Sequence, residues 1–246
     1  MSITRILFST LVPTLLALPL FACDPEAGDD LGDEETRDEL SANKIVNSNY
    51  FIVTGPDYRK CVSPICGGYF VGRVNTDVAR CADGTWQEQC HMYDVDLSAL
   101  NLSKSAEDKA REAIGTSVAL VRGQLVKADV GAAVLADVLV ASEVWIGVTG
   151  NEPDGHFSRV DDTGIVCITY PCPTYIERSL NTNLIDNLDG VDLSTSGATY
   201  QQVADGLTEL NASGLLVAGT HTIVTGPGGT MNALEASEFY TRLTAQ

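Results

Sequence analysis

Short runs of apolar residues, broken by turn-forming residues, recur along the chain after residue 45. The runs at 50–53 and 69–74 are rich in β-branched and aromatic residues, which is typical of strands. Tyr93, Val95 and Leu97 then alternate with acidic residues, as in a strand with one buried face. Two further apolar runs, 118–126 and 138–148, follow. The pattern therefore predicts five strands in the first half of the folded part.

One stretch between the third and fourth predicted strands has helical periodicity. Ser105 can cap a helix with Asp108 three residues on, and Gly115 can end it. Its apolar residues lie on one stripe: Ala106, Ala110, Ala113 and Ile114. In the second half the corresponding stripe is Tyr200, Val203, Leu207 and Leu210. Strands are predicted after it at 215–224 and 236–243.

The two halves of the folded part share residues in the same order. Phe51, Cys61, Cys66, Tyr69 and Asn75 match Phe157, Cys167, Cys172, Tyr175 and Asn181. Three longer matches follow, pairing 95–98 with 191–194, 120–123 with 216–219, and 141–145 with 236–240. The shared order predicts an internal duplication. Because 150–155 is polar and turn-forming, we expect β-rich repeats at 45–150 and 151–246.

The predicted order in each repeat is β-β-β-α-β-β. It indicates a mainly β protein with short helices, in the α+β class, whose sheets are mostly antiparallel. The order is also that of a five-stranded OB-like barrel, although other α+β folds share it. Whether the repeats form two cores or one shared core is left open by the pattern.

The first 22 residues predict a lipoprotein signal peptide. Arg5 precedes an apolar run, 6–20, which two prolines interrupt and which is short for a membrane span. The segment ends Leu20-Phe21-Ala22-Cys23, which resembles the lipobox of bacterial lipoproteins. Cys23 would then carry the lipid and anchor the exported protein to the cell envelope. Ordinary secretion after cleavage near Ala22 is the alternative, and the choice among inner membrane, outer membrane and cell surface stays open.

Charge changes this picture in two ways. The segment 24–44 has nine acidic residues and two basic ones, so we expect 23–44 to be an extended, disordered tether. The whole chain has a formal net charge of -18. Such a charge excludes nucleic acid as a partner and electrostatic docking on anionic lipid, because both need clustered Lys and Arg.

Six of the seven cysteines remain after Cys23 is assigned to the lipid. An even number in an exported protein predicts disulfides. We expect the local pairs Cys61–Cys66, Cys81–Cys90 and Cys167–Cys172. A zinc site built from the first four cysteines is the alternative, although their spacings are atypical of zinc sites.

Residues in patterns typical of catalysis are few. The three histidines, His91, His156 and His221, lack the helical spacing of a metal site, and we expect neither a metal nor a cofactor. Asp162-Thr163-Gly164 resembles the active-site tripeptide of aspartic proteases, but that chemistry needs two carboxylates and no second tripeptide occurs. The acidic residues at 186, 189 and 192 lack EF-hand spacing.

Glu143 and Glu238 are the remaining candidates for a ligand site. They occupy matching positions in two otherwise apolar predicted strands. A carboxylate in such a strand is either a functional group, an outward-facing residue or a buried partner of an arginine. We keep the pair as a candidate ligand site.

The stretch 50–75, followed by Cys81-Ala82-Asp83-Gly84 and Cys90, resembles a family of uncharacterised exported bacterial proteins. These proteins have a Cys-x-Ser-Pro-x-Cys-Gly-Gly-Tyr-Phe-Val core, here 61–71, in a domain of unknown function. The resemblance extends over most of the chain beyond the tether and implies no activity or catalytic residue.

We therefore expect a lipid-anchored envelope or surface protein that binds a protein or small molecule, or has a structural role, without catalysis. One alternative is a hydrolase with a site between the repeats at Glu143 and Glu238. Another is a disulfide-braced protease inhibitor that presents the Cys61–Cys66 loop. The sequence alone does not decide among them.

Overall fold

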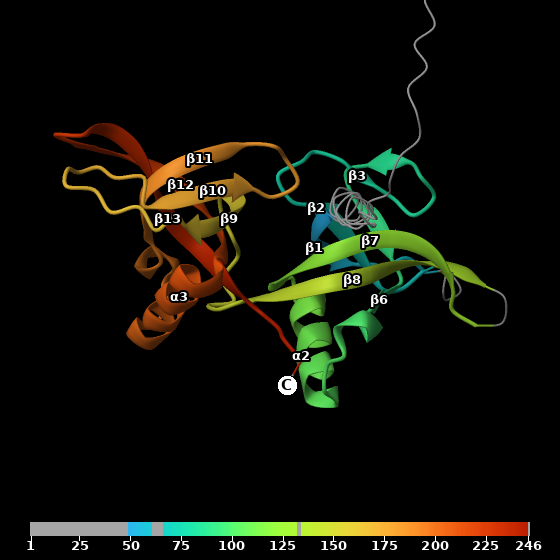
Figure 1. Ribbon diagram of the computed structural model, residues 1–246. Coiled ribbons are helices and arrows are strands. Elements are labelled where there is room, and N and C mark those ends of the chain that lie inside the picture. The colour runs from blue at the N-terminus through green and yellow to red at the C-terminus, as the bar shows by residue number, and fades with distance from the viewer. Residues whose placement is uncertain (1–48, 61–65, 132–133, 246) are drawn as a thin grey trace, which may run out of the picture. The chain divides into compact units, whose positions relative to one another are not determined.

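Strands dominate the protein, as the alternation of apolar and polar residues predicts. The computed structural model describes residues 49–60, 66–131 and 134–245, all within one compact unit, Ser41–Gln246 (Figure 1). The segments predicted to be a signal peptide and a tether, with Cys23, lie outside the described residues. The described part contains two α-helices, and no helix in it is long and apolar enough to cross a membrane. The prediction of a mainly β fold with short helices and mostly antiparallel pairing is confirmed.

The described residues of the first half, within 49–150, form eight strands, one α-helix and a 3-10 turn. Its strands are β1 (Asn49–Pro56), β2 (Tyr69–Arg73), β3 (Ala79–Arg80), β4 (Trp86–Gln87), β5 (Cys90–Met92), β6 (Asp94–Asp96), β7 (Ala119–Asp129) and β8 (Leu135–Gly147). The 3-10 turn η1 (Ser98–Leu100) and the helix α2 (Lys104–Gly115) connect β6 to β7.

The second half, 151–245, contains five strands in a similar order. They are β9 (His156–Asp162), β10 (Tyr175–Ser179), β11 (Ile185–Asp192), β12 (Leu215–Gly226) and β13 (Gly229–Arg242). The 3-10 turn η2 (Ser194–Ser196) and the helix α3 (Tyr200–Ser213) connect β11 to β12.

One helix begins at a different residue from the one predicted. The side chain of Ser103, not Ser105, accepts a hydrogen bond from the backbone N–H of Ala106 and caps α2. The prediction was wrong because both serines precede the apolar stripe, and only the cap geometry distinguishes them. The helix ends at Gly115, as predicted.

The main sheet follows the order β11-β10-β9-β12-β13-β8-β7-β1-β2-β5. Within the second half, β11 pairs antiparallel with β10 and parallel with β13, so the third strand of this half is bonded to both its second and its fifth. In the first half β5 pairs antiparallel with β2, and β6 pairs parallel with β8. Both halves thus have the same strand connectivity, with β5 and β6 together in the place of β11.

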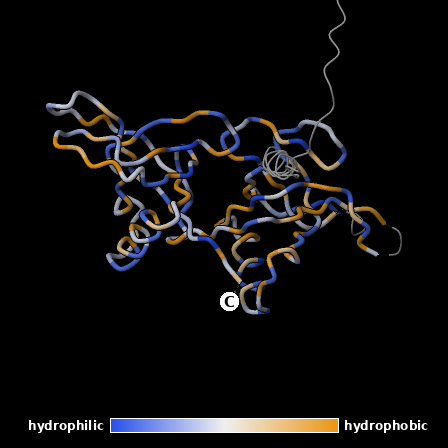
Figure 2. Tube along the Cα trace, viewed as in Figure 1, coloured by the Kyte–Doolittle hydropathy of each residue, from blue (hydrophilic) through white to orange (hydrophobic). Residues whose placement is uncertain are grey.

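The buried apolar residues form three clusters. One lies in the first half and includes Phe51 and Val144; a second lies in the second half and includes Val160 and Phe239. The third draws on both halves: Val74, Leu120, Trp145, Leu180, Leu216, Ala218 and Tyr240. The alternation along the strands that buries these residues is visible as changes of colour along the tube in Figure 2. The halves therefore have a core each and a third core where they meet.

Strands β8 and β13 join the two halves directly. Their antiparallel ladder pairs Tyr240 with Gly147, Thr241 with Ile146, and Arg242 with Trp145. A continuous path of backbone hydrogen bonds therefore crosses from one half to the other.

Candidate functional site

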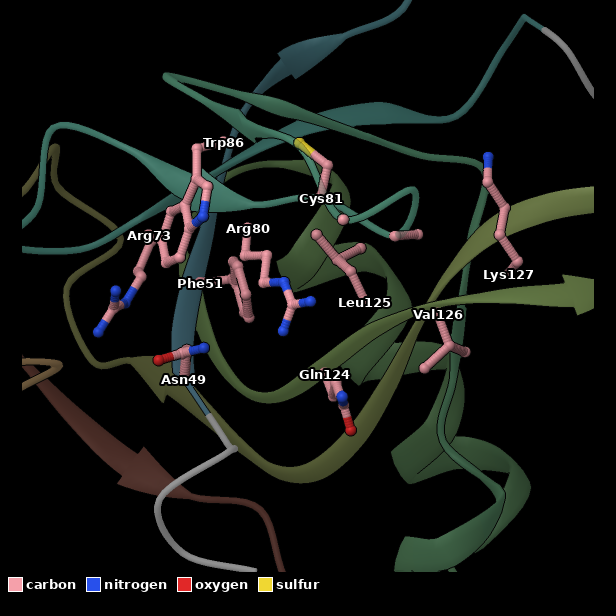
Figure 3. A pocket seen from close by; sticks show the side chains of 12 residues that line it. Asn49, Phe51, Arg73, Arg80, Cys81, Trp86, Gln124, Leu125, Val126 and Lys127 are labelled. Atoms are coloured by element: carbon pink, nitrogen blue, oxygen red, sulfur yellow. The ribbon is translucent and has the colours of Figure 1, made fainter.

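A pocket of about 560 Å³ lies in the first half, beside the start of β1 (Figure 3). Its walls come from β1 and the end of β2, from the hairpin formed by β3 and β4, and from β7. The hairpin contributes Arg80, Cys81 and Trp86, and β2 contributes Arg73. Strand positions thus fix one side of the pocket, and a short hairpin supplies the other.

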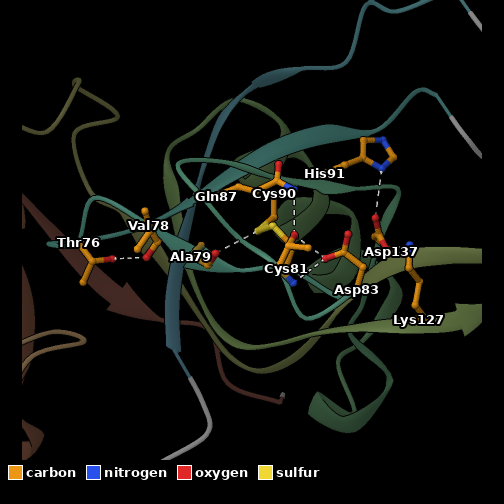
Figure 4. Close-up of a disulfide and its surroundings, with 11 residues drawn as sticks. Thr76, Val78, Ala79, Cys81, Asp83, Gln87, Cys90, His91, Lys127 and Asp137 are labelled. Carbon is orange, nitrogen blue, oxygen red and sulfur yellow. Dashed lines mark hydrogen bonds and ion pairs between the residues drawn. A yellow bond between two sulfur atoms is a disulfide. The ribbon is translucent and has the colours of Figure 1, made fainter. Parts of the chain in front are cut away.

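The hairpin is held by local hydrogen bonds and by a disulfide. Asp83 Oδ1 accepts hydrogen bonds from the backbone N–H and the hydroxyl of Thr85, at 2.9 and 2.7 Å. Gly84 has a φ of 85°, a conformation that glycine adopts without strain. The Cys81–Cys90 disulfide, with a Cα–Cα distance of 5.3 Å, links the hairpin to β5 (Figure 4). Because Cys90 is 1% exposed, the hairpin is fastened to the first core.

Three basic residues line this pocket. Arg73, Arg80 and Lys127 line it, and none of the described residues that line it is acidic. Lys127 forms an ion pair with Asp137, whereas Arg80 has no carboxylate within ion-pair distance among the described residues. In a chain of net charge -18, a pocket of this sign is a local exception.

Arg73 has an unmet hydrogen-bonding group. Its Nη2 donates to the backbone oxygen of Asn181 at 2.8 Å, but its buried Nε has no hydrogen-bond partner among the described residues. Burial lowers the pKa of the Arg73 guanidinium below its ordinary value. Leaving a buried donor unpaired costs about 1–3 kcal/mol, and more for a charged group. A ligand oxygen would remove that cost.

Uncharged groups complete the pocket. Trp86 is 59% exposed, and its side chain lies beside those of Arg73 and Arg80 in Figure 3. Asn49 and Gln124 supply side-chain amides from the neighbouring strands β1 and β7. Guanidinium groups bind carboxylate and phosphate through paired N–H donors, and an exposed indole offers an apolar face to stack on. The pocket combines both kinds of contact.

Sequence reasoning missed this site. The residues Arg80 and Trp86 lie between two predicted strands, in a segment without apolar periodicity. One signal was present, because the Asp83-Gly84 dipeptide between the two cysteines is typical of a tight hairpin turn.

The predicted local disulfides Cys81–Cys90 and Cys167–Cys172 are both present. Cys66 is also disulfide-bonded, whereas Cys61 lies outside the described residues. Among the described residues, no group of three or more His, Cys, Asp and Glu is arranged to hold a metal ion. The two bridges place cysteines 81, 90, 167 and 172 in structural roles.

Glu143 and Glu238 are not brought together. The ladder between β8 and β13 pairs Arg242 with Trp145, so Glu143 lies opposite residue 244, just past the end of β13 and six residues along the chain from Glu238. Six strand residues span roughly 20 Å. Each glutamate has its own partners: Glu143 accepts from Arg122 Nη1 at 3.0 Å and from Trp145 Nε1 at 2.8 Å. The two carboxylates therefore do not form one site.

Glu238 is a fully buried carboxylate that holds the connection between the halves. It is 1% exposed and accepts hydrogen bonds from the backbone N–H of Thr149, Asn151 and Phe239, and from the Thr149 hydroxyl at 2.6 Å. All of these donors belong to the chain itself. Its role in the structure is to fix the turn at 149–151.

The protease-like tripeptide forms a turn. Asp162 Oδ1 accepts a hydrogen bond from the N–H of Gly164 at 2.8 Å, and the Thr163 hydroxyl donates to the backbone oxygen of Pro173 at 2.8 Å. The nearby acidic residue Asp189 accepts from the N–H of Cys172 at 2.7 Å. These carboxylates stabilise loops.

The histidines lie in two places. His91 Nε2 is 2.7 Å from the backbone oxygen of Gly67 and 3.3 Å from Asp57 Oδ2, and its Nδ1 is 3.8 Å from Asp137 Oδ2 (Figure 4). His156 and His221 line one pocket of the second half, although 65 positions separate them in the sequence. The spacing of the two histidines in the sequence did not predict that they line the same pocket.

These features define a mainly β, disulfide-containing domain with two short helices and a donor-rich pocket. The chain belongs to the family described as Domain of unknown function (DUF6748), whose family model matches residues 50–246. No curated protein and no solved structure matches the chain.

Proposed function

We propose that this protein is an exported, lipid-anchored protein of the bacterial cell envelope whose folded body is a non-catalytic binding module. Its ligand is a small carboxylate or phosphate compound with a flat apolar group, bound in the pocket of Arg73, Arg80 and Trp86. The observation that carries the proposal is that the two arginines of this pocket, Arg73 and Arg80, have no carboxylate partner among the described residues, and that Arg73 Nε has no hydrogen-bond partner there.

An anion in this pocket would give unpaired donors a hydrogen-bond partner and would cover exposed apolar surface. A ligand oxygen near Arg73 Nε would satisfy the buried donor, and a second oxygen could bind the Arg80 guanidinium. Hydrogen bonds to charged groups contribute about 1.5–3 kcal/mol each. A flat apolar group over Trp86 would cover an aromatic surface that is now exposed to water.

The anchor is supported by the lipobox-like sequence at 20–23, with Cys23 as the lipidated residue. Disulfides in the folded body are compatible with an exported protein. Two or more acyl chains on one residue would hold the protein stably at a membrane. Metabolic labelling with a fatty acid should mark the wild-type chain and not Cys23→Ser; equal labelling of both would contradict the anchor.

We also propose that the body arose by internal duplication of an OB-like unit. In each half the first strand pairs with the second and the fourth, and the third returns parallel to the fifth, which is the connectivity of an OB fold. In the first half Tyr50 pairs with Arg122, and in the second half Phe157 pairs with Ala218. The strand register therefore makes Tyr50 and Phe157 equivalent positions. This is one residue away from the Phe51–Phe157 match read from the sequence.

Isothermal titration calorimetry on the full-length chain tests the ligand class. Benzoate has charge and ring, acetate has charge alone, and benzyl alcohol has the ring alone; inorganic phosphate is the fourth probe. We expect benzoate to bind more tightly than acetate, and benzyl alcohol to give no saturable signal. If phosphate binds instead of benzoate, the anion is a phosphate.

Two variants locate the binding. Arg80→Gln should weaken benzoate binding about 10- to 100-fold, because it removes a charged donor, and Trp86→Ala should bring benzoate down to the affinity of acetate. Arg178→Gln is the matched control, because it makes the same charge change at a residue that pairs with Asp161 in the second half. Saturable binding of none of the anions, or an equal loss in Arg178→Gln, would show the proposal to be wrong.

A further inference from the structure

The second half has a pocket of about 460 Å³ at the position that the first pocket occupies in the first half. Strand β10 lies beside β9 as β2 lies beside β1, and β12 corresponds to β7. His156 and Ser179 line it, at the start of β9 and the end of β10, as Asn49 and Arg73 line the first pocket. The same place in the fold therefore has different chemistry in the two halves.

A buried carboxylate dominates the second pocket. Glu177 is 4% exposed, and its Oε2 lies 2.6 Å from His221 Nε2. Its other oxygen, Oε1, is buried and has no hydrogen-bond partner among the described residues. An unpaired buried acceptor costs about 1–3 kcal/mol, and more for a charged group. Within the described part of the chain, Glu177 Oε1 is therefore an acceptor without a donor.

The neighbouring polar groups do not supply that donor. His156 Nε2 is 2.6 Å from the Ser179 hydroxyl oxygen, and the Thr182 hydroxyl donates to that same oxygen at 2.5 Å. No lysine or arginine is among the described residues that line the pocket, and Asp186 adds a second carboxylate at its edge. The electrostatic field in the pocket therefore favours a cation.

Apolar residues flank the carboxylate. Leu184 and Ile185 line the same pocket and are 68% and 64% exposed. A ligand with a short apolar part would cover these side chains while its charged end reached Glu177. The pocket thus offers an acidic end and an apolar edge.

We propose that this pocket binds a small organic cation, a primary ammonium group on a short apolar chain, through Glu177 Oε1. An ammonium group suits a single free oxygen because it donates from one point. A guanidinium group binds best to both oxygens of a carboxylate, and Oε2 is already occupied by His221. The inference rests on different residues from the proposed anion site, so either can fail without the other.

Calorimetry with n-butylamine, n-butanol and butylguanidine on the full-length chain tests this inference. The three probes share one apolar chain and differ only in the head group. We expect saturable binding of n-butylamine, weaker binding of butylguanidine and none of n-butanol. This comparison needs no variant, so it decides the question even if a substitution in the pocket prevents folding. Absence of n-butylamine binding, or equal binding of n-butanol, would overturn the proposal.

Glu177→Gln locates the site. Gln has nearly the same shape but no charge, so n-butylamine binding should weaken about 10- to 100-fold. Arg80→Gln, in the first pocket, should leave n-butylamine binding unchanged and weaken benzoate binding. Unchanged n-butylamine binding in Glu177→Gln would place the amine elsewhere and overturn the assignment.

Discussion

Asn75 and Asn181 each reach from one half of the protein into the other and make the same kind of contact there. Asn75 Nδ2 donates to the backbone oxygen of Leu180 at 3.0 Å, and Asn181 Nδ2 donates to that of Val74 at 2.9 Å. Both residues have a positive φ, 58° and 62°. Asparagine tolerates this conformation better than most residues, which explains why a short amide can serve at both positions.

Loss of the Asn181 amide should destabilise the protein by about 2.5–5.5 kcal/mol in Asn181→Ala. The side chain makes three hydrogen bonds across the halves, to the N–H and the oxygen of Tyr50 and to the oxygen of Val74. Each such bond contributes about 0.5–1.5 kcal/mol, and alanine at positive φ adds about 1 kcal/mol. Urea denaturation measures the change in the free energy of unfolding.

Asn101→Ala is the control for that experiment. Asn101 has a φ of 49°, and no side-chain hydrogen bond across the halves is recorded for it among the described residues. Asn101→Ala should lower the free energy of unfolding by about 1 kcal/mol, because only the strain of alanine at positive φ is added. Equal destabilisation by the two substitutions would show that the contacts across the halves contribute nothing.

Removal of the Cys81–Cys90 disulfide should lower stability by about 3 kcal/mol, the chain-entropy value for a loop of this length. The double variant Cys81→Ala, Cys90→Ala should also weaken benzoate binding, because the bridge holds the hairpin that forms one wall of the pocket. Cys167→Ala, Cys172→Ala is the comparison, since that bridge lies in the second half. Thermal unfolding and calorimetry of both variants check this. Unchanged benzoate binding without the Cys81–Cys90 bridge would contradict the role of the hairpin.

Alkaline pH should destabilise the folded protein through Tyr50. Burial, with the negative charge of Glu143, raises the pKa of Tyr50 from 10.0 to about 12. The folded state therefore keeps a proton that the unfolded chain releases, so the contribution is complete below pH 10 and is lost as the pH rises toward 12. The amount is on the order of 2–3 kcal/mol.

Tyr50→Phe tests this dependence, because it keeps the ring and removes the ionisable hydroxyl. The free energy of unfolding of Tyr50→Phe, measured by urea denaturation from pH 8 to 12, should fall less steeply than that of the wild type. Tyr200→Phe is the control, since Tyr200 is 89% exposed. Parallel curves for wild type and Tyr50→Phe would exclude the hydroxyl as the cause.

Substitution of Glu238 should act on stability. Glu238→Gln replaces a buried carboxylate that accepts four hydrogen bonds. The NH2 group of the glutamine would face hydrogen-bond donors and could not accept from them. We expect a loss of about 2–4 kcal/mol. Glu235→Gln, at an exposed position of the same strand, should change stability by about 0.5 kcal/mol or less.

The same glutamates also test the absence of catalysis. A screen for hydrolase activity should find none in the wild type. Hydrolysis by the wild type that disappears in Glu143→Gln, Glu238→Gln, with the protein still folded, would contradict a non-catalytic module.

Much of the fold follows from local rules that the sequence displays. The apolar runs at 118–126 and 138–148 predict the long strands β7 and β8, and Gly115 marks the end of α2. The hairpin of β3 and β4 escaped prediction because strands of two residues have no periodicity. Their place depends on the Cys81–Cys90 bridge and on burial against the first core.

The pockets could not be predicted, because they depend on which strands become neighbours. Glu177 and His221 are 44 residues apart in the sequence and meet only when β10 and β12 lie on either side of β9. In an alternating strand, a glutamate that faces inward has the same sequence pattern as one that faces solvent. Glu143 and Glu238 occupy matching positions in the two halves of the sequence. Such a match indicates equivalent positions in the fold, and it does not bring the two side chains into one site.

The third apolar cluster has a consequence for the history of the protein. Six of its seven buried members occur as matched pairs, one from each half: Val74 with Leu180, Leu120 with Leu216, and Trp145 with Tyr240. A surface that binds its own copy in this way is the mark of an isologous homodimer. Under the proposed duplication, the ancestral protein was a single unit that formed such a homodimer. Fusion of two gene copies then joined the two subunits in one chain. Either half expressed alone should therefore expose this surface and self-associate.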